Sequence, residues 1–123
     1  MRSRMSATRL IRPWRRRHTP GTMNSLEVAY AERLEALRAT GQISSWRFEA
    51  LKLRLADRTY YTPDFLVVAE NTIELHEVKG HWEDDARVKW KVAAEQYPWF
   101  KFVAVMRVRR EWKIEVYGET RGS

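Results

Sequence analysis

Cysteine is absent from this 123-residue chain, and so is any long run of apolar residues. The first absence excludes disulfides, thiolate metal ligands and thiol nucleophiles, and it is typical of proteins from a reducing cytoplasm. The second excludes a membrane-spanning helix, which needs roughly 20 apolar residues. No apolar stretch follows the N-terminal arginines, so a secretory signal is not expected. The sequence therefore predicts a cytoplasmic protein without a membrane partner.

Acidic residues are missing from the first 23 positions, although these hold seven arginines. The whole chain has 23 basic and 16 acidic residues, so the other 100 residues hold 16 of each, and the net charge of +7 belongs to this arm. A basic arm before a neutral body indicates an electrostatic tether to a polyanion, with nucleic acid as the first choice. A solubilising leader is the alternative. The expected nucleic-acid contacts are the arginines around Trp14, namely Arg12, Arg15, Arg16 and Arg17.

The rest of the chain changes between helical and extended patterns. Leu26, Tyr30 and Leu34 recur at helical spacing after a cap at Asn24 or Ser25. The predicted elements are, in order, a helix over 25–40, a half-buried strand or hairpin over 43–59 with a bend near Glu49, a hairpin over 60–79, a helix over 83–97, and strands over 101–108 and 112–117.

This order of helices and strands predicts a single α/β domain with one central mixed sheet. The domain is expected to span 24–118, between the basic arm at 1–23 and a short tail at 119–123. The second helix is expected to bury four residues, Val88, Val92, Ala93 and Tyr97.

Charged residues stand among the strands of the 60–79 hairpin. Asp64 opens one strand, and Glu77 and Lys79 share a face near the end of the other. Pairing the strands across the 69–72 turn sets residue 64 opposite about residue 77. We therefore expect the two carboxylates to lie close together at one end of the hairpin.

Two neighbouring carboxylates repel, and one of them is protonated unless a cation shares the site. A hard divalent ion, Mg²⁺ or Mn²⁺, is the cation that carboxylate oxygens select. Beside such an ion, Lys79 could position a water or neutralise charge on a phosphate, as phosphodiester hydrolysis requires. From the residues alone, a ladder of ion pairs between Lys79 and the carboxylates explains the pattern equally well.

Pro63-Asp64, followed thirteen positions after the aspartate by Glu77-Val78-Lys79, resembles the signature of the PD-(D/E)XK nucleases. The stretches YTPDF and EVKGHWEDDARVKWKVAAEQYP, with NSLEVAYAERLEALRATGQISSWRFE upstream, are similar to the phage endonuclease I family of Holliday-junction resolvases. The likeness covers residues 24–106. It implies a restriction-endonuclease-like domain, in which helices flank a central mixed β-sheet.

Taken position by position, the resemblance implies that Asp64, Glu77 and the Val78 carbonyl hold Mg²⁺, for which Mn²⁺ can substitute. Lys79 would be the catalytic lysine. Glu27 matches a glutamate on the family's first helix that supports the second metal or the water, although on sequence alone it is an ordinary exposed helix acid.

The activity implied is metal-dependent hydrolysis of DNA phosphodiester bonds, with branched DNA as the substrate and a homodimer as the working form. A phage-encoded chain would act in the cytoplasm of the host. A nuclease for linear duplex or single strands, or for transposition or packaging, is the alternative within enzymes. A catalytically silent DNA-binding module is the alternative outside them, and an RNA-associated protein would need only the arm.

Basic residues outside the arm are further candidate contacts for DNA. The second helix offers Arg87, Lys89 and Lys91, for which a solvated basic face is the alternative reading. The strip Arg-Val-Arg-Arg at 107–110 is a second candidate phosphate contact at the end of a strand.

Three residues near the signature are expected to have no catalytic role. His81 is expected to be solvated, with a contact to a phosphate or the water as the alternative. Trp82 is expected to pack against the second helix rather than to stack on a base. His76 points to the opposite face from Glu77 and is expected to be structural.

Overall fold

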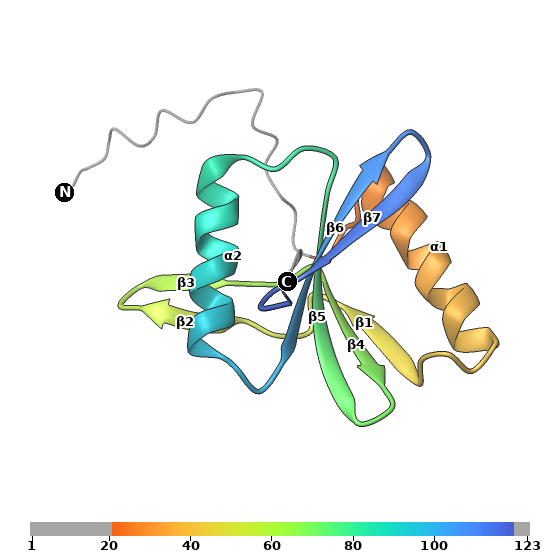
Figure 1. Cartoon of the computed structure of the whole chain (residues 1–123), viewed down its shortest axis with the longest axis horizontal. Helices are drawn as coiled ribbons and strands as arrows, with labels where there is room; N and C mark the ends of the chain where they lie inside the picture. Colours follow the sequence, from red (N-terminus) through yellow and green to blue (C-terminus); the bar gives the residue numbers. More distant parts are fainter. Residues whose placement is uncertain (1–20, 120–123) are drawn as a thin grey trace.

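The computed structural model describes residues 21–119 as a mixed five-stranded β-sheet with one helix against each face (Figure 1). The strand order is β1-β4-β5-β6-β7, in which β5 and β6 are parallel and the other neighbours are antiparallel. A separate hairpin, β2–β3, completes the described part. The elements are α1 (Ser25–Ala39), β1 (Ser45–Phe48), β2 (Leu53–Ala56), β3 (Thr59–Tyr61), β4 (Phe65–Ala69), β5 (Thr72–Lys79), α2 (Asp84–Gln96), β6 (Lys101–Val108) and β7 (Glu111–Val116).

The predicted α/β class with a central mixed sheet is confirmed. No helix within residues 21–119 is long and apolar enough to cross a membrane. Most of the predicted arm, residues 1–20, and most of the tail, residues 120–123, lie outside the described residues.

Helix α1 begins and ends where the sequence signals indicated. The Asn24 side chain accepts a hydrogen bond from the Glu27 N–H at 2.8 Å, and the Glu27 side chain accepts one from the Asn24 N–H at 3.0 Å. This reciprocal capping box satisfies two backbone donors at the helix start. Gly41 follows the helix with a φ of 83°, which glycine adopts without a steric penalty. Tyr30 and Leu34 are buried against the sheet.

Residues 43–59, predicted as one long strand or hairpin, instead form two strands that belong to different sheets. β1 pairs with β4 in the main sheet, whereas β2 pairs with β3. Between them Glu49 takes a φ of 49°, at the bend that the change of pattern indicated. The hairpin predicted to begin at residue 60 begins instead at Phe65, because Thr59–Tyr61 form β3 and pair with β2.

Burial of Leu53 and Tyr61 explains why the β2–β3 hairpin leaves the main sheet. Both side chains pack in one hydrophobic cluster with Trp90 of α2 and Leu75 of β5. The hairpin therefore lies on the same face of the sheet as α2, while α1 covers the other face.

Helix α2 forms as predicted, and of its four expected core residues Ala93 is buried and Tyr97 packs against the same cluster, but the prediction is wrong for Val88 and Val92. Val88 is 59% exposed and Val92 is 37% exposed, whereas Trp90, Ala93 and Ala94 are buried. The large Trp90 indole turns the helix so that it, rather than the two valines, faces the sheet. An indole buries more apolar area than a valine side chain, so it decides the orientation.

Candidate active site

The β4–β5 hairpin brings two buried carboxylates to its open end. Phe65 pairs with His76, so the preceding residue, Asp64, lies opposite Glu77. The Asp64 Oδ2 atom accepts a hydrogen bond from the Val78 N–H at 2.8 Å. Asp64 is 8% exposed and Glu77 is 7% exposed. The neighbouring carboxylates that the strand spacing predicted are therefore present.

Both oxygens of Glu77 have a polar partner. The Tyr61 hydroxyl donates a hydrogen bond to Oε1 at 2.7 Å, and the Lys79 Nζ atom lies 3.4 Å from Oε2. Lys79 is the more exposed partner, with 36% of its side chain accessible. The lysine thus stands at the mouth of the site, with the glutamate beneath it.

Tyr61 is the member of this site that the sequence prediction missed. It belongs to β3, and its hydroxyl reaches Glu77 only because β2–β3 folds over this face of the sheet. A tyrosine three residues before the aspartate gives no signal of that contact in the sequence.

Burial makes ionisation of the two carboxyls unfavourable. For Asp64, burial and the negative charge of Glu77 raise the pKa well above its ordinary value, and the Val78 N–H opposes them only in part. For Glu77, burial raises the pKa, against the lowering effects of Lys79 and the Tyr61 hydroxyl. Burial lowers the pKa of Lys79, but the charges of Glu77 and Asp64 outweigh it and keep the pKa raised, so the lysine stays protonated. The cluster holds two acids and one cation.

Glu27 reaches the same region from α1. Its side chain is buried at 6% exposure, so the expectation of an ordinary exposed helix acid is wrong. It caps the helix through Asn24, and its charge acts on both Asp64 and Lys79. The first turn of α1 lies beside the end of β5, because a Cβ on Gly80 would stand 3.7 Å from the Leu26 Cδ2 atom.

A hard divalent cation fits the donor set of this site. Mg²⁺ is commonly held by one or two carboxylates, with water and substrate phosphates completing its shell. Asp64 and Glu77 supply that number, and the Val78 carbonyl belongs to the residue that already hydrogen-bonds Asp64. Within residues 21–119, no group of three or more histidine, cysteine, aspartate or glutamate side chains is close enough to hold a metal. Any ion here would therefore rely on water, a carbonyl or substrate for its other ligands.

Of the predicted DNA contacts, the structure describes those on α2 but not the arginines of the arm. Arg12, Arg15, Arg16 and Arg17 lie outside the described residues. On α2, Lys89 and Lys91 are exposed. The Arg87 guanidinium, in contrast, lies 2.9 Å from the Glu115 Oε2 atom and over the rings of Trp82 and Trp90. Arg87 therefore has a structural role between α2 and β7.

The remaining expectations near the signature agree with the structure. Trp82 packs on Trp90 with ring centroids 5.8 Å apart, and His81 is exposed. His76 is buried on the α1 face, where its Nδ1 atom lies 2.7 Å from the Tyr30 hydroxyl and its Nε2 atom 2.8 Å from a Glu74 oxygen. These contacts make His76 part of the packing beneath α1.

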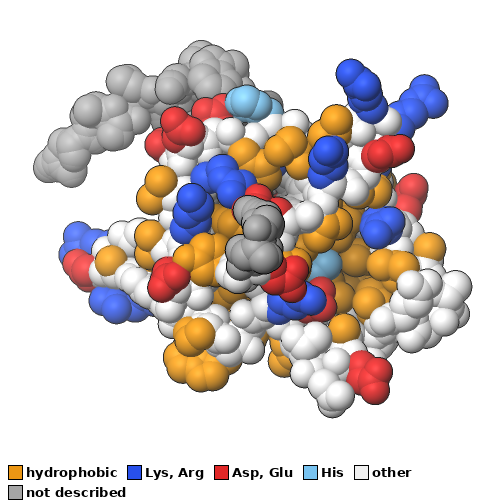
Figure 2. Space-filling view, viewed as in Figure 1, with side chains coloured by type: hydrophobic (Ala, Val, Ile, Leu, Met, Phe, Trp, Pro, Cys, Tyr) orange, Lys and Arg blue, Asp and Glu red, His pale blue; other side chains and the backbone are white. Residues whose placement is uncertain are grey.

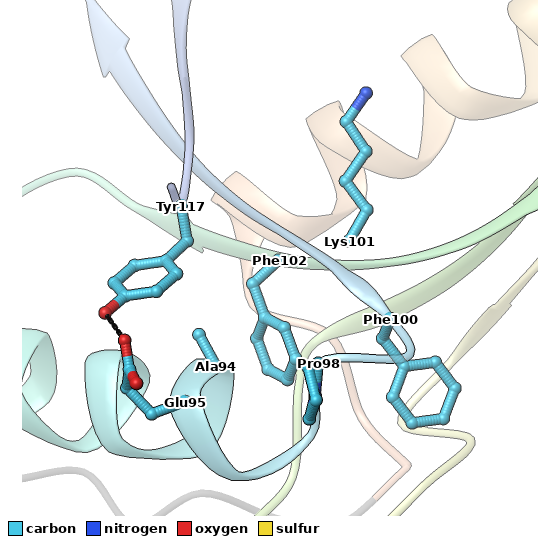
Figure 3. A pocket seen from close by; sticks show the side chains of 7 residues that line it. All are labelled: Ala94, Glu95, Pro98, Phe100, Lys101, Phe102 and Tyr117. Carbon is cyan, nitrogen blue, oxygen red and sulfur yellow. Dashed lines mark hydrogen bonds between the residues drawn. The ribbon is translucent and has the colours of Figure 1, made fainter. Parts of the chain in front are cut away.

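A pocket of about 260 Å³ lies at the other end of the sheet, between the end of α2 and the start of β6 (Figure 3). β6 begins there at Lys101, which aligns with Glu74 rather than with Glu77. The Tyr117 hydroxyl donates to Glu95 in the pocket wall, and Lys101 points away from the aromatic side chains. This pocket is separate from the carboxylates.

No protein-family model, curated protein or solved structure matches this chain.

Proposed function

We propose that this protein is a metal-dependent endodeoxyribonuclease with a PD-(D/E)XK site on a restriction-endonuclease-like fold. The observation that carries the proposal is the pairing of Asp64 with Glu77 at one end of the hairpin, with Lys79 beside them. Two buried acids with raised pKa values are costly to a fold that uses them only for packing. A divalent cation would remove that cost, which favours a metal site over a ladder of ion pairs.

Each residue would have a distinct task. Asp64, Glu77 and the Val78 carbonyl would hold Mg²⁺ or Mn²⁺, which when bound supplies a Lewis acid and an activated water. The protonated Lys79, at the mouth of the site, would orient the attacking water and offset charge on the phosphate. Tyr61 would keep the Glu77 carboxylate in place through its hydrogen bond. Glu27 would add negative charge on the α1 side of the site.

The place where the arm joins the fold supports nucleic acid as the substrate. The Gly21 N–H donates to the Glu49 side chain at 2.9 Å, and the Glu49 N–H donates to the Asp64 carbonyl at 2.8 Å. Gly21, the first described residue after the seven arginines, is therefore linked through Glu49 to the backbone of Asp64. Arginine contacts with phosphate would raise the local concentration of DNA at the site.

The resemblance to junction resolvases is the reason why we also propose branched DNA as the substrate and a homodimer as the working form. Resolution of a junction requires two symmetric cuts, which a two-fold dimer provides. The sheet has β1 and β7 as its two edge strands, and either could take part in an exchange between copies.

The test compares cleavage of a four-way junction, a linear duplex and a single strand of matching sequence. Each is incubated with Mg²⁺, Mn²⁺ or EDTA, using the wild type and Asp64→Ala. The proposal expects metal-dependent cleavage by the wild type, none by the variant, and a preference for the junction. Sedimentation of the same samples reports whether the active species is a dimer.

Each result separates one part of the proposal. A wild type that cuts none of the three substrates with either metal would leave a DNA-binding module as the function. Equal cleavage of junction and duplex would contradict the preference for branched DNA but would still support a nuclease. Cleavage in the presence of EDTA would contradict the proposed metal dependence.

A further inference from the structure

Three arginines occupy turn positions that normally hold glycine or asparagine. Arg58 in the β2–β3 turn has a φ of 55°, and Arg109 and Arg110 in the β6–β7 turn have φ values of 50° and 69°. Two-residue hairpin turns of this kind favour Asn-Gly, because positive φ brings a Cβ too close to the backbone. The β4–β5 turn follows that rule with Asn71 at 61°. Strained residues that a fold retains point to a function for their side chains.

Both arginine turns belong to hairpins that pass beside the carboxylates, since Ala104 of β6 aligns with Glu77 and Tyr61 of β3 hydrogen-bonds it. β6 runs parallel to β5 with Met106 aligned to Lys79, and it continues to Val108 before the turn. The Arg109-Arg110 turn therefore projects beyond the end of β5 that carries the site. The β2–β3 hairpin is tied to the same site, because Tyr61 at its base hydrogen-bonds Glu77.

The two turns extend to different sides of the end of β5 in Figure 1, β2–β3 toward the left and β6–β7 toward the upper right. Figure 2 shows Lys and Arg side chains, with Asp and Glu side chains beside them, at the left edge and at the upper right edge of this view. Exposed arginine side chains thus lie in turns on both sides of the candidate active site.

One contact ties the β2–β3 hairpin to α2, and another joins the two strands of the β6–β7 hairpin. The Tyr97 hydroxyl donates to the Arg54 carbonyl at 2.7 Å, which ties β2 to the end of α2. The Arg107 guanidinium lies 4.1 Å from the centre of the Trp112 ring across the β6–β7 hairpin. By contrast, the side chains of Arg58, Arg109 and Arg110 form no ion pair or hydrogen bond with another residue in the range 21–119.

We propose that these two arginine turns, Arg58 on one side and Arg109-Arg110 on the other, bind the phosphates of DNA that flank the bond at the carboxylates. The inference rests on the proposed function for its substrate. Guanidinium groups bind phosphate oxygens in pairs of parallel hydrogen bonds, and because the fork is planar, less side-chain entropy is lost per hydrogen bond than with lysine. The strain in the turns is retained because asparagine or glycine would remove these contacts.

The test uses substitutions that relax the turns while they remove the charges. The variants are Arg58→Gly and the double variant R109N/R110G. The matched control is R38Q/K101Q, which removes one positive charge from the last turn of α1 and one from the start of β6. Binding of a fluorescent duplex and a four-way junction is measured in EDTA over a range of salt, and thermal unfolding is measured in parallel.

The turn variants are expected to be more stable than the wild type but to bind DNA more weakly. The melting temperature rises in both turn variants, because residues suited to positive φ replace arginine. The slope of log K against log salt decreases by about 1 for Arg58→Gly and about 2 for R109N/R110G, one for each lost phosphate contact. The control keeps the wild-type slope. An unchanged slope in the turn variants, or an equal decrease in the control, would overturn the inference.

The binding assay also separates this inference from the proposed function. A wild type that binds DNA through these turns but cuts no substrate with Mg²⁺ keeps the inference and removes the nuclease. If the wild type cuts DNA and the turn variants bind DNA as tightly as the wild type, the nuclease proposal is kept and the inference about the turns is rejected. Absence of DNA binding by the wild type removes both.

Discussion

The Asp64 carboxylate is fixed to the Val78 backbone by a 2.8 Å hydrogen bond that crosses from the start of β4 to the end of β5. This bond occupies Oδ2, so the aspartate is held in position by the hairpin itself. The residue that holds it is the one whose carbonyl is the third proposed metal ligand. Aspartate position and backbone ligand are therefore set by the same strand pairing.

Asp64→Asn and Glu77→Gln are expected to stop cleavage and to leave the fold intact. Either change replaces a carboxylate that we propose as a metal ligand with a neutral amide. Activity with Mg²⁺ should therefore fall at least about 100-fold. The amide oxygen of the asparagine introduced by Asp64→Asn can still accept the hydrogen bond from the Val78 N–H, so the structure is kept. Initial rates on plasmid DNA measure the first effect and circular dichroism the second. Retention of wild-type rates by both variants would contradict the assignment.

Stability without metal is expected to decrease as the pH rises. The folded pKa values of Asp64 and Glu77 lie above their ordinary values of 3.8 and 4.5, so the folded protein holds these protons more tightly than the unfolded chain. The stabilisation by these protons is complete below the ordinary values and is lost as the pH rises through the raised ones. Melting temperatures in EDTA between about pH 5 and pH 8 test this sign.

Mg²⁺ should oppose that loss, because it binds the ionised carboxylates of the folded protein. Its stabilising effect is expected to grow with pH. The double variant D64N/E77Q is the control, and it should show neither the Mg²⁺ effect nor this part of the pH dependence. A Mg²⁺ shift of equal size in the double variant would place the metal elsewhere.

Tyr61→Phe should weaken both the fold and the site. It removes a 2.7 Å hydrogen bond to a buried carboxylate, which is typically worth about 1.5–3 kcal/mol. The Tyr61 bond lowers the pKa of Glu77, so its loss should move the acidic limb of the activity profile to higher pH. Tyr60→Phe is the matched control, since Tyr60 is exposed at 41% and surface changes stay within about 0.5 kcal/mol. An unshifted pH profile in Tyr61→Phe would assign the hydroxyl to packing alone.

Glu27→Gln separates the two tasks of Glu27. Glutamine keeps the capping box but carries no charge, so stability should stay within about 0.5 kcal/mol of the wild type. Activity should fall by about 10- to 100-fold if the charge supports the metal or the water. Asn24→Ala provides the comparison, because it removes the cap at a cost of about 1 kcal/mol and keeps the charge. Full activity in Glu27→Gln would leave Glu27 as a capping residue.

The buried face of α2 can be checked by two substitutions. Trp90→Ala should cost about 3–5 kcal/mol, since it empties the centre of the cluster between α2 and the sheet. Val88→Gln should change stability by less than about 0.5 kcal/mol, because Val88 is exposed. Urea unfolding measures both. A large loss of stability in Val88→Gln would show that Val88 is buried, as the sequence predicted.

Local signals in the sequence were sufficient for several elements of the fold. The capping residues of α1, the Asn71 turn and the alternation in β5 each depend on near neighbours in the chain. The same local rules set Asp64 opposite Glu77, because a two-residue turn fixes the register of its hairpin. These features were therefore open to prediction from the residues alone.

Contacts between distant segments were not open to prediction in this way. Whether Val88 or Trp90 faces the sheet depends on the shape of the surface that α2 meets. The β2–β3 hairpin leaves the sheet because Leu53 and Tyr61 find more burial against α2. Both outcomes are decided by competition for apolar surface, which no local pattern contains.

The sequence by itself determined which chemical groups are available and where the two carboxylates meet, since spacing along a hairpin is a local property. Only the tertiary structure decided that Tyr61 hydrogen-bonds Glu77, that Glu27 is buried near them, and that the β2–β3 and β6–β7 turns lie on different sides of the end of β5. Each of these depends on elements brought together by packing across the sheet, and their distances are set by burial rather than by separation along the chain.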